Sequence, residues 1–412
     1  MADGAEPRID SERVIADLRE LAKRTGDDHG AQRLCWTPVW ERARDFLTEL
    51  LGEIGLEPER DDAGNLWARL EGGAEPPLAV GSHIDSVPDG GWLDGALGVM
   101  AGVGVLRAWA ASGERPPRSL LLVDWADEEG ARFGVSLFGS SAYAGRLSAS
   151  VRGLRDQEGN QVADVLAAND VDLGAALGAS SPRRELVAYL ELHIEQGPVL
   201  EAEGLEAAAV EGCVGIERHR LIFSGQAAHA GTTPMDRRAD AGLAAADTAL
   251  RIEAIAVDAG GMGTTGALTL EPGIPTAVPG SAEMIVDLRH ADESRLAAML
   301  TAAMSAAREA AAARRCGVQS TRVWSIDPTQ FADDLVDLAA AVVKERTGTA
   351  RRLVSGALHD AAEVARVAPA AMLFVPSIAG ISHAREEDTS EGDLASGIEA
   401  FGMLVNRTLA HA

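Results

Sequence analysis

The chain has 412 residues, of which 46% are hydrophobic and 24% charged, a globular composition that excludes a disordered or collagen-like protein and is long enough for two domains. Its formal net charge of −26 repels nucleic acid and anionic membranes, so we expect neither as a partner. No signal peptide and no apolar run of roughly 18 to 20 residues is present, and the three cysteines are far apart, so we expect a cytoplasmic protein without disulfides.

The first part of the chain alternates predicted helices and strands. Amphipathic helices are predicted at 8–24 and 38–55, where apolar residues recur at three- and four-residue spacing. Four short apolar runs then predict strands buried in a sheet, at 77–80, 120–125, 186–192 and 371–375. Helical segments at 95–111 and 137–147 lie between them. This alternation predicts an α/β fold with an open, mixed sheet.

The middle of the chain has a different pattern. Strands are predicted at 216–223, 266–271, 283–289 and 318–324, and Ala-rich helices at 236–257 and 291–314. The order strand, helix, two strands, helix, strand is that of a ferredoxin-like α+β layer. We therefore expect an inserted domain at 212–327, with 1–211 and 328–412 forming one discontinuous domain around it.

Each of the four buried strands ends in a polar cluster that contains metal-ligating residue types. His83 follows the first strand, Glu128 and Glu129 the second, His193 the third and His383 the fourth. Sites in open α/β sheets form at the carboxyl ends of strands, so these side chains are expected to converge. Imidazole and carboxylate ligands without cysteine suit Zn²⁺, Mn²⁺, Ni²⁺ or Co²⁺.

One further carboxylate completes the predicted metal site. Asp94 lies in a Gly-rich loop that can turn tightly enough to bring its side chain to the metals. A bridging carboxylate holds two cations roughly 3.5 to 4 Å apart, which suits one shared hydroxide nucleophile. Glu128 and Glu129 point to opposite sides of the strand end, so one can bind metal while the other acts as general base.

These clusters belong to longer motifs that resemble the M20 metallopeptidase superfamily and, within it, the hydantoinase/carbamoylase branch of N-carbamoyl-L-amino acid hydrolases and allantoate amidohydrolases. The matching stretches are GSHIDSVPDGGWLDGALGV (81–99), DEEGARF (127–133), HIEQGPVLE (193–201), GQAAHAGTTPM (225–235), VDLRH (286–290), SGALHDA (355–361) and VPSIAGISHAREEDTS (375–390).

The resemblance implies a role for each residue of the predicted metal site. One metal would be bound by His83 and His193, the other by Glu129 and His383, and Asp94 would bridge them. Glu128 would be the general base. Asp85 resembles the carboxylate that orients the His83 imidazole.

The resemblance also implies a lid domain that forms a homodimer, and our inserted domain matches it. The matching lid histidine, His229, would polarise the scissile carbonyl, in the family often across the dimer. Gln196 and Arg289 resemble substrate contacts, and Arg289 could grip a carboxylate with two hydrogen bonds. The main chain of Gly356 and Ala357 would also meet the substrate.

Two residues on the substrate side depart from the family pattern. Thr276 stands where the family usually has an asparagine that assists the arginine, and Leu358 stands where glycine is common. The nearby His359 and Asp360 have no clear role. These departures leave the metal ligands intact and put the identity of the substrate in question.

The sequence therefore predicts a two-metal amidohydrolase for a small substrate that carries a carboxylate. N-carbamoyl-L-amino acids rank first as substrates, allantoate or another ureido acid second, and N-acyl amino acids or dipeptides third. A catalytically dead binding protein is the alternative of another class, and the intact Glu128 argues against it. The absence of a cysteine cluster disfavours a structural zinc protein.

Overall fold

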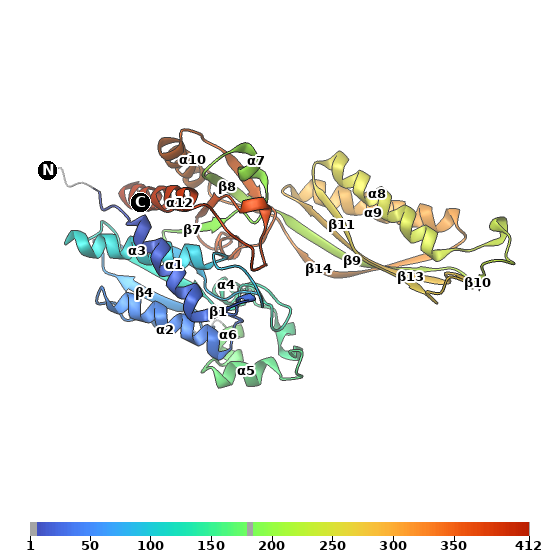
Figure 1. The fold of residues 1–412 in the computed structure, drawn as a ribbon, viewed down its shortest axis with the longest axis horizontal. Coiled ribbons are helices and arrows are strands. Elements are labelled where there is room, and N and C mark those ends of the chain that lie inside the picture. Colours follow the sequence, from blue (N-terminus) through green and yellow to red (C-terminus); the bar gives the residue numbers. More distant parts are fainter. Residues whose placement is uncertain (1–5, 179–183, 412) are drawn as a thin grey trace. The chain divides into compact units, whose positions relative to one another are not determined.

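The structure, a computed structural model, describes residues 6–178 and 184–411. It divides into two compact units (Figure 1). The first contains the chain up to Gly212 and from Gln330 onward, and the second is Cys213–Thr329, where 212–327 was expected. Among the described helices, none combines the length and the apolar character needed to cross a membrane.

The first unit is built on a mixed sheet with the strand order β15-β8-β17-β7-β5-β6-β4-β3, in which β16 also pairs with β8. The strands are β3 (Glu59–Arg60), β4 (Leu66–Leu70), β5 (Leu78–His83), β6 (Leu120–Trp125), β7 (Ala188–Ile194), β8 (Ala208–Cys213), β15 (Thr329–Gln330), β16 (Arg352–Ser355) and β17 (Ala370–Val375). A separate pair, β1 (Gly26–Asp27) and β2 (Gly30–Ala31), lies outside this sheet.

The four predicted strands form the centre of the sheet. β17, β7, β5 and β6 run parallel to one another, whereas β8 pairs antiparallel with β17 and β4 pairs antiparallel with β6. Every residue of the four central strands is buried, as expected where helices cover both faces of a parallel sheet. The mixed α/β sheet predicted from the sequence is confirmed.

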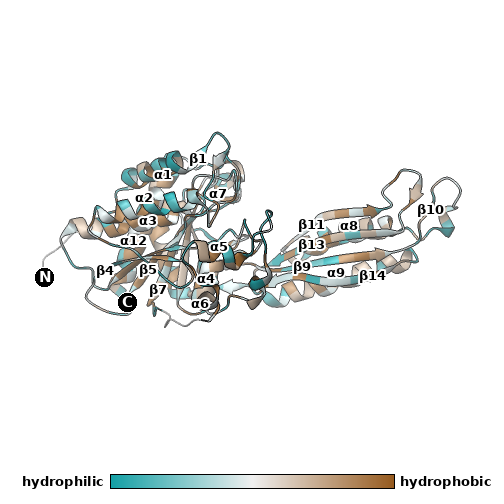
Figure 2. Cartoon of the chain, turned by 90° about the horizontal axis from the view of Figure 1, so that it is seen from below, coloured by the Kyte–Doolittle hydropathy of each residue, from teal (hydrophilic) through white to brown (hydrophobic). Residues whose placement is uncertain are grey.

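Helices of the first unit cover this sheet. α3 packs on β5, β6 and β7, α12 packs on β7 and β17, and α1 packs on both helices. Figure 2 shows α3 largely apolar and α1 with a polar outer surface. The helices are α1 (Ser11–Thr25), α2 (Pro38–Gly52), α3 (Ala96–Ser112), α4 (Phe138–Tyr143), α5 (Val162–Ala168), α6 (Leu173–Gly178), α7 (Val199–Glu203), α10 (Asp333–Thr347), α11 (Asp360–Val364) and α12 (Glu391–His411).

The second unit is a four-stranded antiparallel sheet with two helices packed on it. The strand order is β11-β13-β9-β14 and the chain order β9-α8-β11-β13-α9-β14, which is a ferredoxin-like arrangement. The elements are β9 (Gly215–Ser224), α8 (Ala241–Ala259), β11 (Met262–Glu271), β13 (Ser281–His290), α9 (Glu293–Ala313) and β14 (Gly317–Ile326), with a ribbon of β10 (Ala228–His229) and β12 (Ala277–Val278) beside them.

Alternating burial of side chains explains β13, and a side-chain cap explains where α8 begins. In β13 alternate residues are buried, and Met284, Val286 and Leu288 join the core formed with α8 and α9. Helix α8 begins at Ala241 rather than at 236, because the Asp240 side chain caps it by accepting a hydrogen bond from the Leu243 N–H.

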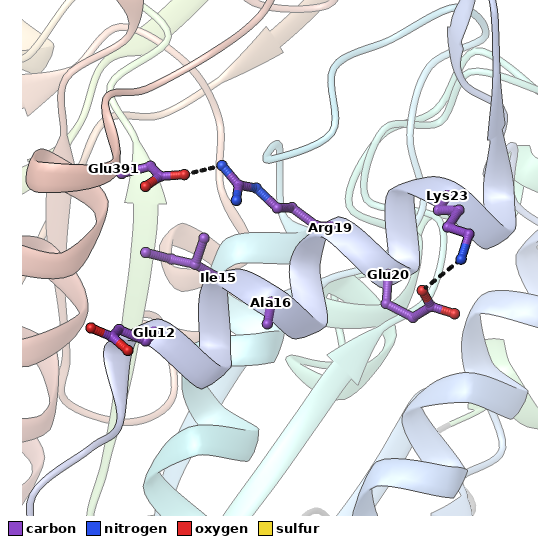
Figure 3. A pocket seen from close by; sticks show the side chains of 7 residues that line it. All are labelled: Glu12, Ile15, Ala16, Arg19, Glu20, Lys23 and Glu391. Atoms are coloured by element: carbon purple, nitrogen blue, oxygen red, sulfur yellow. Dashed lines mark hydrogen bonds and ion pairs between the residues drawn. The ribbon is translucent and has the colours of Figure 1, made fainter.

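A surface groove of about 440 Å³ runs along α1 in the first unit (Figure 3). Its lining is mainly charged, and Arg19 pairs there with Glu391 at the start of α12. None of the predicted site residues lines it. The groove is therefore separate from the predicted metal site.

Candidate metal centre

The structure brings the five predicted metal ligands together around the carboxylate of Asp94. One oxygen, Oδ1, lies 3.2 Å from His193 Nε2 and 3.8 Å from His83 Nε2. The other, Oδ2, lies 3.2 Å from His383 Nε2, which is 3.5 Å from Glu129 Oε2. Two groups result, each with all its ligand atoms within 4.8 Å of one another, and Asp94 is common to both. The donor set fits two divalent cations of the Zn²⁺ or Mn²⁺ type.

Main-chain carbonyls orient the two buried imidazoles. The Nδ1 of His83 is 3.1 Å from the carbonyl oxygen of Asp85, and the Nδ1 of His193 is 2.9 Å from that of Ile194. If each Nδ1 donates its proton to that carbonyl, each Nε2 is left as a lone-pair ligand on the side of Asp94.

The Asp85 carboxylate was expected to orient the His83 imidazole, but in the structure it contacts other groups. Its carboxylate is 3.6 Å from His83 Nδ1, beyond hydrogen-bond distance, and its main-chain carbonyl makes the shorter contact. The two carboxylate oxygens accept hydrogen bonds from the N–H groups of Glu128 and Glu129, each at 3.2 Å. Asp85 therefore positions the backbone of both glutamates. Sequence spacing could not distinguish its carbonyl from its carboxylate.

The two adjacent glutamates lie on different sides of Asp94. Oε2 of Glu128 is 3.6 Å from His83 Nε2, whereas Glu129 faces His383. Glu128 is only 6% exposed, and burial, followed by the charges of Asp360 and Glu129, raises the pKa of its carboxyl well above the ordinary value. Glu128 therefore lies beside the group of His83, Asp94 and His193 but is not a member of it.

When no metal is bound, protonated side chains can balance the negative charge of the predicted ligand carboxylates. Burial opposes protonation of His193, but the hydrogen bond and charge of Asp94 outweigh it and raise the pKa to about 9. The hydrogen bond to Asp94 also raises the pKa of His383 to about 9. Burial, followed by the charge of Asp94, raises the pKa of Glu129 to about 8, and burial lowers the pKa of His83 to about 3.

Buried charges that sequence reasoning missed support the site. Asp124, at 0% exposure, accepts a hydrogen bond from the Ile84 N–H at 2.8 Å and pairs with Arg44 at 2.7 Å. Arg33 is also fully buried, donates to the Ile84 carbonyl at 2.7 Å and interacts with the charges of the ligand carboxylates. In a sequence such charged residues look like exposed surface residues, so the spacing of apolar residues could not have identified them.

A further missed residue is Glu387, which is 1% exposed and lies in the loop between β17 and α12. Its carboxylate accepts hydrogen bonds from the main-chain N–H groups of two predicted metal ligands, Asp94 and His383. The signal was present in the sequence as the second glutamate after His383, but an adjacent Glu-Glu pair normally marks an exposed turn.

Two of the predicted substrate-contact regions lie beside the ligands. Gln196, at a positive φ of 58°, donates from Nε2 to Asp94 Oδ2 at 3.0 Å. The loop with Gly356 and Ala357 follows β16, and the Ala357 N–H donates to Ser355 Oγ at 3.1 Å. That hydroxyl is 2.9 Å from His359 Nε2, and the His359 ring stacks edge-on against His193 at 4.4 Å between centroids. His359 thus packs this loop against His193, a predicted metal ligand.

The remaining predicted residues lie in the second unit, at two separate places. His229 and Thr276 are neighbours in the β10-β12 ribbon, where the Ala230 N–H donates to the Thr276 carbonyl at 2.9 Å. Arg289 lies at the other end of β13 and donates to Asp287 at 2.8 Å. Arg289 is eight positions after Ser281 in this strand, which at about 3.3 Å per step is roughly 26 Å. The structure therefore does not bring Arg289 to His229 and Thr276 within one chain.

Comparisons with known proteins identify relatives of this chain. Residues 79–407 match the sequence profile of peptidase family M20/M25/M40. The chain is 34% identical over 399 residues to an N-carbamoyl-L-amino-acid amidohydrolase of Paenarthrobacter aurescens, covering 95% of this chain and 96% of the relative. It is 30% identical over 412 residues to a ureidoglycolate hydrolase of Oryza sativa subsp. japonica, covering 97% and 85%. A crystal structure of a hydantoinase/carbamoylase family amidase from Burkholderia multivorans superposes with a TM-score of 0.89 at 32% identity, covering 97% and 98%.

Proposed function

The chain belongs to peptidase family M20/M25/M40 and to its hydantoinase/carbamoylase amidases, and on that premise we propose that it hydrolyses the carbamoyl C–N bond of N-carbamoyl-L-amino acids with two divalent metal ions. It is a hydrolase of C–N bonds other than peptide bonds. The observation that carries the proposal is the pair of ligand groups that share Asp94, with Glu128 beside them and outside both.

In this mechanism the protein supplies the ligands, the base and a hydrogen-bond donor. His83, His193 and Asp94 would hold one cation, and Glu129, His383 and the other oxygen of Asp94 the second. Bound cations supply Lewis acidity, which polarises the substrate carbonyl and acidifies the attacking water. Glu128 takes a proton from that water and returns it to the leaving amine nitrogen. The products are the free amino acid and carbamic acid, which decomposes to CO₂ and ammonia.

The tautomer of His229 supports its proposed role at the developing oxyanion. The Gly231 N–H donates to His229 Nδ1 at 3.1 Å, so Nδ1 is an acceptor and the neutral imidazole carries its proton on Nε2. An Nε2–H group held in this way can donate a hydrogen bond to the carbonyl oxygen as negative charge develops there.

We propose that the second unit pairs with the second unit of another copy of the chain. Leu243, Leu250 and Val257 recur at seven-residue spacing on α8 and are exposed by 41%, 69% and 73%. Beside this stripe, β11 is an edge strand that carries the exposed Leu268 and Leu270. An apolar stripe next to an open strand edge is typical of a surface that associates with another chain, which we propose is a second copy of this one.

The separation of the lid residues gives a second argument for a dimer. A small substrate cannot span the roughly 26 Å between Arg289 and the ribbon that carries His229. If both residues act on one substrate, two copies of the chain must supply them. We therefore propose that Arg289 binds the substrate carboxylate and that His229 and Thr276 come from the partner.

Thr276 favours one second candidate, a ureido acid related to ureidoglycolate. A threonine hydroxyl is shorter than the asparagine amide usual here and suits a hydroxylated substrate. The similarity to a ureidoglycolate hydrolase is consistent with this alternative.

A substrate panel tests the proposal. Enzyme loaded with Mn²⁺ or Zn²⁺ is given N-carbamoyl-L-amino acids, allantoate, ureidoglycolate and N-acetyl amino acids, and both ammonia and free amino acid are measured. We expect chelator-sensitive release of both products from the N-carbamoyl compounds. Release of amino acid from N-acetyl substrates alone, or equal turnover after exhaustive chelation, contradicts the proposal.

A further inference from the structure

We propose that Glu387 is a positioning residue that holds the Asp94 loop and the His383 loop in register, and so sets the affinity of the metal pair and above all of the ion at Glu129 and His383. The inference rests on the two-metal function proposed above. Glu387 is 1% exposed and lies four residues after His383.

Each oxygen of the Glu387 carboxylate binds a different loop. Oε1 accepts hydrogen bonds from the N–H groups of Leu93 and Asp94, at 3.2 and 3.0 Å. Oε2 accepts from the Ser382 hydroxyl at 2.8 Å and from the His383 N–H at 3.3 Å. One side chain thus joins two segments almost 300 residues apart in sequence, each of which carries a proposed ligand of the second metal.

The Asp94 loop is shaped to receive this carboxylate. A Cβ atom on Gly91 would lie 1.9 Å from Glu387 Oε1 and 2.5 Å from Glu387 Cβ, far closer than atoms can approach. Only glycine therefore fits at position 91. Part of the glycine content of this loop serves the approach of Glu387, in addition to the tight turn that brings Asp94 to the metals.

Ser382 and Gln196 connect Glu387 to the side chains of the proposed ligands. The Ser382 hydroxyl lies 3.3 Å from Asp94 Oδ2, the oxygen that faces His383. Gln196 Nε2 reaches the same oxygen at 3.0 Å and Ser382 Oγ at 3.3 Å. A displacement of Glu387 would therefore move the second metal group through both its backbone and its side chains.

The chemistry at this position requires a carboxylate. Three of the four groups that meet Glu387 are main-chain N–H donors, and they approach both of its oxygens. A glutamine has one oxygen, so its NH₂ group must face donors on one side. If the oxygen keeps the two N–H groups of Leu93 and Asp94, the NH₂ group opposes the N–H of His383. Glu387→Gln should then loosen the His383 loop first.

The test compares Glu387→Gln with wild type and with Glu386→Gln. Glu386 is the adjacent glutamate, its side chain is 56% exposed and it bonds to Arg385, so its variant controls for loss of one acidic charge. Metal stoichiometry and affinity are measured by equilibrium dialysis with Zn²⁺ and by chelator competition, and unfolding of the chelated proteins is measured in parallel.

We expect Glu387→Gln to bind one of the two ions, the one assigned to Glu129 and His383, about 10- to 100-fold less tightly, the usual effect of changing a residue that orients a ligand. The affinity for the other ion should change less, the chelated variant should unfold as wild type does, and Glu386→Gln should bind both ions normally. Equal affinities in Glu387→Gln and wild type overturn the inference, as does an equal loss for both ions accompanied by reduced stability. Wild-type protein that binds fewer than two ions instead refutes the proposed function.

Ser382→Ala keeps the inference testable if Glu387→Gln does not fold. This variant removes one of the four donors to Glu387 and leaves the other three. A smaller loss of affinity at the same ion supports the inference, and unchanged affinity for both ions contradicts it.

Discussion

Adding two divalent metal ions to the chelated protein at pH 7 should release about three protons. Without metal, the charge of Asp94 is balanced by protonated ligands, because the pKa values of His193 and His383 are raised to about 9 and that of Glu129 to about 8. A metal ligand must be deprotonated, so each of the three gives up its proton on binding. His83 contributes none, because burial lowers its pKa to about 3 and it is already neutral.

The same pKa values fix the pH dependence of proton release. At pH 7 the three groups are almost fully protonated, and above pH of about 9.5 they are largely deprotonated, so release should fall from about three protons toward zero over this range. Isothermal titration calorimetry in buffers of different ionisation enthalpy measures the number directly. Release of one proton or none at pH 7 would refute the proton-balanced site.

Stability of the chelated protein should change in the same window. A raised histidine pKa stabilises the folded state below the unfolded value of 6.5, and this contribution is lost as the pH rises through about 9. Glu129, raised from 4.5 to about 8, also favours the folded state less as the pH rises between these values. The chelated protein should therefore lose stability between pH 6.5 and 9 while metal affinity increases, so the difference in Tm between loaded and chelated protein should widen.

Three substitutions test other parts of the structure. Glu128→Gln should lower kcat by about 10²- to 10⁴-fold, the usual contribution of a general base, with metal content unchanged, and wild-type turnover would exclude this base. Arg44→Met should reduce the free energy of unfolding by about 3–5 kcal/mol, because it leaves the fully buried Asp124 without its ion-pair partner. A denaturant titration measures this change, and a loss below about 1 kcal/mol would show that the pair contributes little to stability. Leu250→Glu should convert a dimer into monomers in sedimentation experiments and reduce turnover by removing the partner's His229, and a fully active monomer would contradict the shared site.

The central strands were predictable because burial on both faces favours long apolar runs, which these strands show apart from single buried acidic residues such as Asp124 and Glu191. The antiparallel strands at their sides were missed. β4 has three apolar residues before the exposed Arg69, and β8 has three before the half-buried Glu211, so each offers only a short apolar run. The largest error in a helix boundary is at the start of α8: the helix expected from 236 begins after its cap at Asp240, because 235–237 forms a separate 3-10 turn.

The convergence of the proposed ligands was predictable for a related reason. A polar residue directly after a buried strand has few other roles, and parallel strands bring such residues to one edge of the sheet. The supporting residues were not, because their importance depends on burial that only the fold creates. Arg33 and Glu387 look like ordinary surface charges in the sequence, yet they are 0% and 1% exposed.

The burial of so many acidic groups makes cations part of the fold of this site. Asp85, Asp94, Glu128 and Glu387 are each at most 6% exposed, and Arg33 is a fully buried cation whose charge interacts with several of them. Burying ionised carboxylates is costly unless positive charge accompanies them. Protons on the imidazoles and on Glu129 can supply part of that charge near neutral pH, but only by occupying the atoms that catalysis needs as ligands. Two divalent ions, as proposed above, would compensate the carboxylates without blocking Glu128, and the acidic cluster that destabilises the metal-free site would then select metal over protons as the pH rises.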